Sequence, residues 1–399
     1  MIKTLKKAGL FLVIYFISAS YNLFSQVSAG TEVYLLTCSP GTATYSIYGH
    51  SALRIVIPDE EIDLVYNWGV FDFATPNFAW KFARGRLEYM LGVYSFDRFL
   101  QEYFFERRSV CQQKINLEPR EIETLLGLIA ENLKPENIKY TYDFFYDDCS
   151  TRIRDLLEKS VGSNLFYPPE PMKDIPTFRT KVNEYQQPYP WLLFAVDLLL
   201  GTPADKKADL RDRMFLPLEM QKGLSRTVVN RGGRMIPLLQ NPSPLLEFDP
   251  PEFKRSFATT PMFIFSLALI LVIILSSTVR GRKANRIIDL IIFSVYSLLA
   301  LLILFFSFVT DHDQTKWNLN IIWLNPFIIL CLVSLLLDKQ WHAWFGIVFF
   351  LAVFAFIIQI IFPNAFSSAF IPLELLLAVR SSLRAGFSWN PLSVHLTEN

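Results

Sequence analysis

Long apolar runs near the C-terminal end of the chain are the strongest pattern in the sequence. They occupy roughly 262–279, 287–309, 321–337, 343–362 and 365–379. A helix needs about 20 residues to cross the hydrocarbon core of a bilayer. The first four runs come near that length, whereas the fifth is short and is interrupted by Pro372 and Glu374. The pattern therefore predicts an all-α transmembrane bundle of four to five spans at 259–385, followed by a C-terminal tail at 386–399.

The N-terminus shows the charged, apolar and small-residue order of a secretory signal. Lysines at positions 3, 6 and 7 precede the apolar stretch Ala8–Ile17, and small residues follow at 18–20 and 27–29. A cleaved signal peptide and an uncleaved anchor at 1–26 both fit this pattern. Either one would export the next ~230 residues.

Basic residues fix the expected orientation of the spans. Arg280, Arg282, Lys283 and Arg286 lie between the first two apolar runs, and the positive-inside tendency places such a loop in the cytoplasm. The domain at 27–258 is then outside, as the signal also requires. The loop at 310–318, which contains His312, Trp317 and Asn318, should lie on the same outer side.

Within the exported domain the pattern is α+β. Val33–Cys38 is rich in β-forming residues, and Ser51–Ile57 and Ile62–Phe71 read as a hairpin around a polar turn. Glu118–Leu133 has the spacing of an amphipathic helix, with Pro119 in its favoured first turn.

Two further segments are rich in aromatic residues. We expect Phe78–Phe105 to be mostly helical, with an interruption at Arg84–Arg86. Phe166–Pro190 is also rich in proline, so it should wrap the surface without regular structure.

Composition narrows the functional classes. Hydrophobic residues make up 52% of the 399 residues, which is too apolar for a wholly soluble protein. The net charge of +1 and the lack of a basic tract interleaved with aromatics exclude a nucleic-acid partner. We therefore expect a membrane protein with a large exported domain.

Cys149 has the sequence context of a reactive thiol. Asp147 and Asp148 precede it, and the residues from Ser150 onward have helical spacing, so Cys149 should lie in the first turn of a helix. Helix N-termini lower thiol pKa values and can form part of an oxyanion hole. The structural alternative is a capped helix with a buried thiol, with Asp148 or Ser150 as the cap.

His50 is the only histidine before the first membrane run, so it is the only base that the exported domain can pair with Cys149. It follows Gly49 and opens a predicted strand. A thiol mechanism also needs a polar group that orients the imidazole. The strand after the hairpin offers Asn67, with Asp72 as a second choice; a surface role for His50 is the alternative.

The remaining cysteines and the possible metal ligands point to no second centre. In an oxidising compartment Cys38 and Cys111 could form a disulfide, but each could equally be buried alone. The exported domain has one histidine and no zinc-ligand spacing. We therefore expect no metal and no cofactor.

These motifs resemble two known groups. A Gly-His strand, a hairpin returning to a polar residue and a later cysteine at a helix start resemble a circularly permuted NlpC-type papain-like fold. The chain resembles the Lnb family of bacterial lipoprotein N-acyltransferases more closely. The residues that carry this resemblance are 37–41 (TCSPG), 48–54 (YGHSALR), 149–155 (CSTRIRD), His312, 317–320 (WNLN) and 323–326 (WLNP).

The resemblance implies transfer of a fatty acyl chain from a phospholipid donor to the N-terminal amine of a diacylglyceryl-modified lipoprotein, in the inner (cytoplasmic) membrane. Cys149 would form the thioester, His50 would move the protons and Asn67 would orient His50. The Cys149 N–H would hold the oxyanion, with Tyr48 or Ser46 as second donor. The remaining candidates for substrate contact are Arg54, Arg152, Arg154, His312, Trp317 and Asn318. The last three could instead simply mark the border between water and lipid.

One position departs from the family pattern. Asp148 stands where asparagine is expected, and a carboxylate beside the thiol would oppose thiolate formation. We therefore expect Asp148 either to point away or to pair with Arg152 or Arg154.

Other functions remain open at this stage. A membrane-tethered NlpC-type hydrolase of cell-wall peptides would use the same Cys149 and His50, although it would need only one tether. A non-enzymatic binding module on a polytopic anchor would not need Cys149 at all.

Overall fold

The computed structural model describes residues 30–253, 256–279, 281–362 and 366–387, in two compact units. The first unit contains residues up to 178 together with 207–252, and the second contains 179–206 together with the chain from 253 onward. The chain therefore passes between the units three times. The predicted signal or anchor at 1–26 and most of the predicted tail lie outside the described residues.

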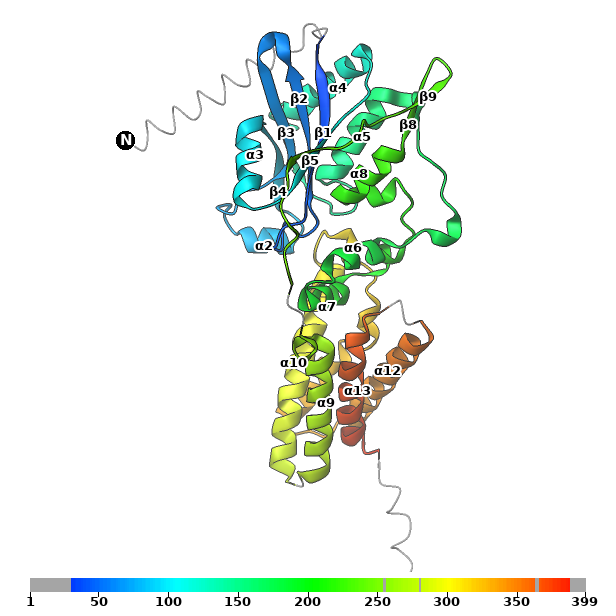
Figure 1. Cartoon of the computed structure of the whole chain (residues 1–399). Coiled ribbons are helices and arrows are strands. Elements are labelled where there is room, and N and C mark those ends of the chain that lie inside the picture. The colour runs from blue at the N-terminus through cyan, green and yellow to red at the C-terminus, as the bar shows by residue number, and fades with distance from the viewer. Residues whose placement is uncertain (1–29, 254–255, 280, 363–365, 388–399) are drawn as a thin grey trace, which may run out of the picture. The chain divides into compact units, whose positions relative to one another are not determined.

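The first unit is built on a seven-stranded antiparallel sheet, with strand order β10-β5-β1-β2-β3-β4-β6 (Figure 1). The strands are β1 (Glu32–Cys38), β2 (His50–Ile57), β3 (Ile62–Val70), β4 (Glu88–Ser95), β5 (Val110–Lys114), β6 (Lys139–Thr141) and β10 (Ser243–Leu246). β2 and β3 form the predicted hairpin, with Ile57 paired to Ile62. A second sheet has the order β7 (Leu165–Phe166), β8 (Val228–Arg231), β9 (Arg234–Pro237).

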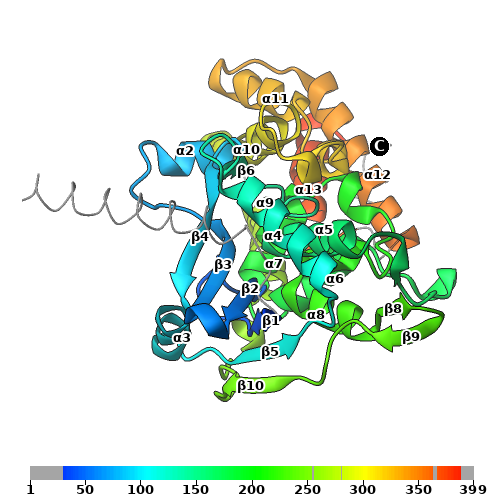
Figure 2. The ribbon, with the colours of Figure 1, turned by 90° about the horizontal axis from the view of Figure 1, so that it is seen from above.

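Helices cover both faces of the larger sheet (Figure 2). α4 (Pro119–Leu133) and α5 (Cys149–Val161) pack on one face, where Leu125, Ile129 and Ile153 are buried against Leu53 and Trp68. α3 (Phe96–Phe105) packs on the other face through Phe99 and Tyr103. α8 (Pro217–Arg226) and the short α2 (Phe78–Ala83) complete the unit. The predicted α+β class is confirmed for this part of the chain.

The aromatic stretch at 78–105 corrects the prediction of a mostly helical segment. Only α2 and α3 are helical, and Glu88–Ser95 between them is strand β4, which pairs with β3 and β6. Tyr and Val favour strands, and β4 contains Tyr89, Val93 and Tyr94. Pairing with two flanking strands decided the conformation, not local helix propensity.

The segment at 166–190 also differs from its prediction. Phe178–Gln186 forms helix α6, and a 3-10 turn lies at Met172–Asp174. Four prolines lie before Phe178, whereas the helix itself contains none and ends before Pro188. Regular structure therefore forms in the proline-free stretch of the segment.

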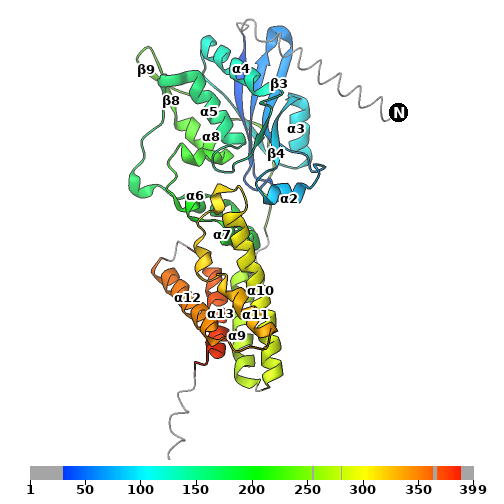
Figure 3. The same ribbon diagram turned by 180° about the vertical axis from the view of Figure 1, so that it is seen from behind.

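The second unit is helical, as predicted (Figure 3). Its helices after α6 are α7 (Pro190–Leu199), α9 (Pro261–Thr278), α10 (Arg282–Phe308), α11 (Phe327–Leu336), α12 (His342–Ile361) and α13 (Ile371–Ala385). Among the described residues, three helices are long and apolar enough to cross a membrane: α9, most of α10 and α12. Their surfaces are rich in exposed apolar side chains such as Leu298 and Phe350.

Two apolar runs deviate from simple spans. The run at 321–337 is a bent pair, in which a 3-10 segment and α11 meet at an angle of 57°. Pro326 caps α11, and the Asn325 side chain bonds to both sides of the break. The run at 365–379 contributes to α13, a 15-residue helix. The predicted number of spans therefore stays a prediction.

A buried ion-pair network ties three helices of this unit together. Arg380 on α13 binds Asp289 on α10 at 2.6 Å and donates to Ser276 on α9 at 2.7 Å. Arg384 forms a second ion pair with Asp289. Asp289 and Arg380 are almost completely buried, so the network holds the helices through groups that cannot be left unpaired at low cost.

Candidate active site

Cys149 is the first residue of α5, as its sequence context predicts. Asp148 is the N-cap and accepts hydrogen bonds from the backbone N–H groups of Ser150 and Thr151 at 2.9 and 2.8 Å. Thr151 completes a capping box by accepting from the Asp148 N–H at 2.7 Å. Cys149 is 6% exposed, so the cap holds its sulfur at the edge of the core.

The thiol faces the strands that carry His50 and Asn67. A Cβ atom at Gly69 on β3 would lie 3.6 Å from Cys149 Cβ, and Gly69 has a φ of +89°. The Ser51 N–H on β2, one residue after His50, is directed at the thiol. Ser150 Oγ, next in the chain to Cys149, donates to Ser51 Oγ at 3.3 Å. The helix start is therefore fixed against β2 and β3.

Burial and hydrogen bonds act on the thiol in opposite directions. Burial raises the pKa of Cys149, while the Ser51 N–H, the Ser150 hydroxyl and the N–H groups at the start of α5 lower it. Burial is the larger effect, so the resting side chain is a thiol that needs a base. This differs from the depressed thiol pKa expected from the helix start alone.

His50 and Asn67 form the pair that the sequence predicts. His50 Nε2 lies 2.5 Å from Asn67 Oδ1. Because Oδ1 can only accept, this contact assigns the proton to Nε2 and leaves the Nδ1 lone pair available for a proton. Burial lowers the pKa of His50, partly offset by the bond to Asn67, so the imidazole is neutral and suited to be a base.

Local backbone features position both residues of this pair. Gly49 before His50 has a φ of +86°, and a Cβ there would meet the Cys38 carbonyl oxygen at 2.8 Å, so only glycine fits. The pairing of β3 with β4 is shifted between Asn67 and Val70, which marks a bulge. Bulges redirect side chains at the ends of sheets.

Among the described residues, Cys149 Sγ makes no hydrogen bond to the His50 ring. Both side chains instead lie at one corner of the first unit, where the hydrogen bond between Ser150 and Ser51 joins α5 to β2. Catalytic hydrogen bonds are often long in substrate-free structures and shorten when substrate binds.

Asp148 caps its own helix and pairs with neither of the two arginines that the sequence offers as partners. Its bonds to Ser150, Thr151 and the Thr151 hydroxyl all converge on Oδ1, so the carboxyl turns into its own helix. Arg152 instead pairs with Asp147 at 2.5 Å, and Arg154 pairs with Asp155 at 2.7 Å. Burial, followed by the neighbouring Cys149, raises the pKa of Asp148 well above its ordinary value.

Several other predicted candidates are occupied by structural contacts. Ser46 donates to the Ala43 carbonyl at 2.9 Å, and Arg54 forms an ion pair with Asp63 and lies over the Phe96 ring. Asp72 is exposed and accepts from the Ala74 N–H, whereas Asn67 contacts His50. Tyr48 packs on Phe144, with ring centroids 4.8 Å apart.

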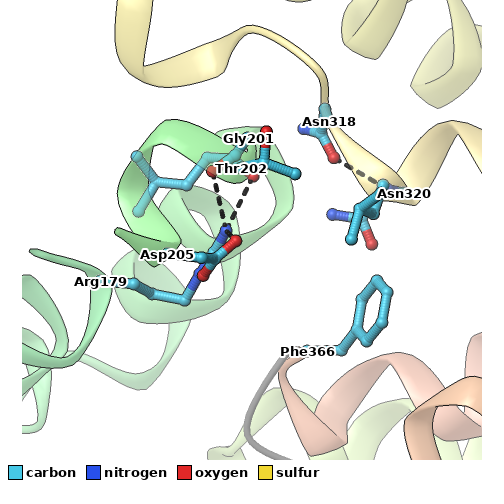
Figure 4. A pocket seen from close by; sticks show the side chains of 9 residues that line it. Arg179, Gly201, Thr202, Asp205, Asn318, Asn320 and Phe366 are labelled. Atoms are coloured by element: carbon cyan, nitrogen blue, oxygen red, sulfur yellow. Dashed lines mark hydrogen bonds and ion pairs between the residues drawn. The ribbon is translucent and has the colours of Figure 1, made fainter. Parts of the chain in front are cut away.

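His312, Trp317 and Asn318 belong to the second unit. Trp317 is 75% exposed, and His312 stacks on Phe306. Asn318 is buried and donates to the Leu198 and Leu199 carbonyls at the end of α7, so it anchors that helix. The same segment borders a small pocket, where Asn318, Asn320 and Phe366 face Arg179, Gly201 and Asp205 (Figure 4).

Arg179 in that pocket is held by ion pairs with Asp205 at 2.6 Å and Asp197 at 3.2 Å. It also donates to the Leu200 and Gly201 carbonyls. Its donors are therefore used within the protein. The residues of this pocket therefore hold segments of the second unit together.

The structure adds three residues that the sequence did not single out: Ser51, Gly69 and Tyr142. The Tyr142 ring lies 3.7 Å from the Cβ position of Gly69. Burial, with Asp148 and Cys149 nearby, raises the Tyr142 pKa, which keeps its hydroxyl a neutral donor. The sequence offered one signal for these residues, which is that Gly69 follows the predicted site residue Asn67 by two positions.

All four cysteines are free thiols, so Cys38 and Cys111 form no disulfide. Within the described part of the chain, no group of His, Cys, Asp and Glu side chains could hold a metal ion.

Two family models match the chain. The Lnb N-terminal periplasmic domain matches residues 21–180, and the Lnb transmembrane domain matches residues 252–388. Together these ranges cover about three quarters of the sequence. No curated protein and no solved structure matches the chain.

Proposed function

The chain belongs to the Lnb family, and from this premise we propose that it is a thiol-dependent lipoprotein N-acyltransferase. It has a periplasmic domain and a transmembrane domain, and Lnb domains point to lipoprotein maturation. The proposed reaction moves a fatty acyl chain from a phospholipid to the N-terminal amine of a diacylglyceryl-modified lipoprotein. The observation that carries it is the His50–Asn67 pair beside a cysteine at a helix start.

In the first half-reaction, His50 Nδ1 takes the proton from Cys149 Sγ. The sulfur attacks the ester carbonyl of the phospholipid and forms a C–S bond. When the ester C–O bond breaks, the leaving lysolipid oxygen takes the proton from Nδ1. The products are a thioester on Cys149 and a neutral His50.

In the second half-reaction, the amine of the lipoprotein attacks the thioester carbonyl. His50 accepts a proton from the amine as the C–N bond forms. The C–S bond then breaks, and the proton passes to the departing sulfur. The cycle needs no cofactor, because each proton that His50 accepts is returned.

The neutral thiol and the neutral imidazole suit this cycle. A raised thiol pKa keeps Cys149 uncharged until a substrate arrives. A lowered His50 pKa leaves Nδ1 free to accept. Asn67 fixes the ring through Nε2, which is a positioning role. The Cys149 N–H, in the first turn of its helix, would stabilise the oxyanion.

Incubation of the purified full chain with a phospholipid labelled in its acyl chain tests the proposal. We expect a labelled adduct that hydroxylamine releases, and we expect Cys149→Ala to abolish it. Cys111→Ala is the matched control, because Cys111 is a half-buried thiol on β5, and it should retain the label. If the wild-type protein acquires no label, the proposed thioester intermediate is wrong.

Mass spectrometry of the lipoprotein N-terminus separates the proposed transfer from its alternatives. An added acyl chain on the amine supports the transferase. Release of free fatty acid or cleavage of cell-wall peptides, without that addition, would instead indicate the hydrolase. Full function in Cys149→Ala would indicate a binding module.

A further inference from the structure

Exposed aromatic side chains gather at one end of the first unit. Tyr45, Phe73, Trp80 and Phe82 are 59%, 64%, 57% and 54% exposed. They lie in the loop before β2, the loop after β3 and helix α2. Large apolar side chains grouped in this way mark a binding surface.

Three of these side chains, Tyr45, Phe73 and Phe82, form the outer end of a continuous series of ring contacts, which we name the aromatic track. Phe82 stacks on Phe78 with centroids 6.3 Å apart, and Phe78 is 5.9 Å from Phe71. Phe71 contacts Tyr89 at 5.2 Å, and Tyr89 contacts Tyr142 at 4.4 Å. Phe73 contacts both Phe71 and Phe78, at 4.9 and 5.1 Å.

The inner end of the aromatic track reaches the thiol. Tyr142 and Cys149 both approach Gly69, at 3.7 and 3.6 Å from its Cβ position. A side chain at Gly69 would fill the space between them. Gly69 therefore lies between the last ring and Cys149.

The charges around the exposed end favour lipid over peptide. No acidic residue occurs between Asp72 and Glu88, whereas Lys81, Arg84 and Arg86 lie in this interval. Arg84 lies 5.8 Å over the Trp80 ring, and its buried Nε has no hydrogen-bond partner. Within the described chain Lys81 forms no ion pair. Aromatic rings beside cations with unused donors are typical of the boundary between lipid tails and phosphates.

We propose that the aromatic track holds the acyl chain that is transferred. The ester carbonyl lies at Cys149, and the methylene chain runs along Tyr142, Tyr89, Phe71 and Phe78 to the exposed end. That end rests among the tails and phosphates of the bilayer, where Lys81 and Arg84 meet phosphate. This inference rests on the proposed acyl transfer and adds the site that selects the acyl chain.

Photo-crosslinking tests the location without requiring catalysis. The full-length Cys149→Ala protein is placed in phosphatidylethanolamine vesicles that contain a phospholipid with a diazirine at the end of one acyl chain. After irradiation, we expect crosslinks in peptides covering residues 71–89. Crosslinks found only in the apolar helices α9, α10 and α12 would overturn the aromatic track. The proposed acyl transfer would still stand in that case, because the acyl adduct on wild-type Cys149 tests it separately.

Chain-length dependence tests the same site through the reaction. Phe73→Ala with Phe82→Ala should slow labelling of Cys149 by a palmitoyl donor about tenfold, the factor that 1.4 kcal/mol of lost contact gives. Labelling by a hexanoyl donor should not change. Phe105→Ala is the control, since Phe105 is 80% exposed and, in the described part of the chain, its ring contacts only that of Phe104. Equal slowing with both donors, or equal slowing in the control, would refute the track.

Discussion

Replacing Asp148 separates the two roles that the structure gives this residue, as a helix cap and as a charge beside the thiol. Asp148→Asn keeps an oxygen at Oδ1, where all the side-chain bonds converge. The amide nitrogen would take the place of Oδ2, which makes none of these bonds. We therefore expect Asp148→Asn to change the free energy of unfolding by less than about 0.5 kcal/mol. Asp148→Ala removes the cap.

The structure sets the size of the loss in Asp148→Ala. An ordinary N-cap deletion costs about 0.5–2 kcal/mol, because water replaces the cap. Ser150 and Thr151 are completely buried, and each buried N–H without an acceptor costs about 1–3 kcal/mol. We expect a loss of about 2–4 kcal/mol in the local stability of α5.

Hydrogen–deuterium exchange over residues 149–161 measures this loss directly in the full chain. Asp148→Ala should accelerate exchange there by about 30-fold to 1,000-fold, while Asp148→Asn should match the wild type. The pH dependence of Cys149 alkylation reports the charge. Asp148→Asn should move its inflection to lower pH, because it removes a carboxyl group whose ionisation would oppose the neighbouring thiolate. Equal instability of both variants, or a higher inflection in Asp148→Asn, would refute this reasoning.

Three further outcomes follow from the described contacts. Gly69→Ala should reduce acyl labelling and cost about 1–2 kcal/mol of stability in thermal melts, because its φ of +89° is unfavourable for alanine; unchanged melting would contradict it. Burial lowers the pKa of His50. The contribution of the neutral imidazole to the free energy of unfolding is therefore fully present above the ordinary histidine pKa, and it is lost as the pH falls below that value. Unfolding at graded pH should show this loss, and His50→Gln should remove it. Asp289→Asn leaves Arg380 buried without its counter-charge and should cost about 3–5 kcal/mol, measured by melting in detergent; adding Arg380→Met should restore much of the loss.

Local signals in the sequence were enough for the elements that carry the site. Alternating β-formers define β1 to β3, and the polar turn at 58–61 sets the hairpin. Pro119 and the apolar spacing define α4, and Asp148 with Thr151 defines the start of α5. Each signal lies within a few residues of the feature it predicts, which is why it can be read without the fold.

Contacts between distant segments account for what could not be predicted. Glu88–Ser95 became a strand because β3 and β6 lie on its two sides. The thiol pKa rises through burial against β2 and β3, an effect that no local pattern shows. Tyr142 and Gly69 meet Cys149 only in the folded chain. The order of rings between Phe82 and Tyr142 likewise depends on tertiary packing.

The segment at 179–206 behaves as an insertion whose ends are already joined in space. Thr177 forms a β-bridge with Lys207, and the Ala208 N–H donates to the Pro176 carbonyl at 2.8 Å. Cutting the chain after residue 252 would retain α7 but remove the asparagines that hold its end, exposing an apolar helix to water. Combining the cut after residue 252 with deletion of 179–206, and closing the gap with a few glycines, should instead give a water-soluble thiol domain. Its Cys149 could then be titrated without detergent.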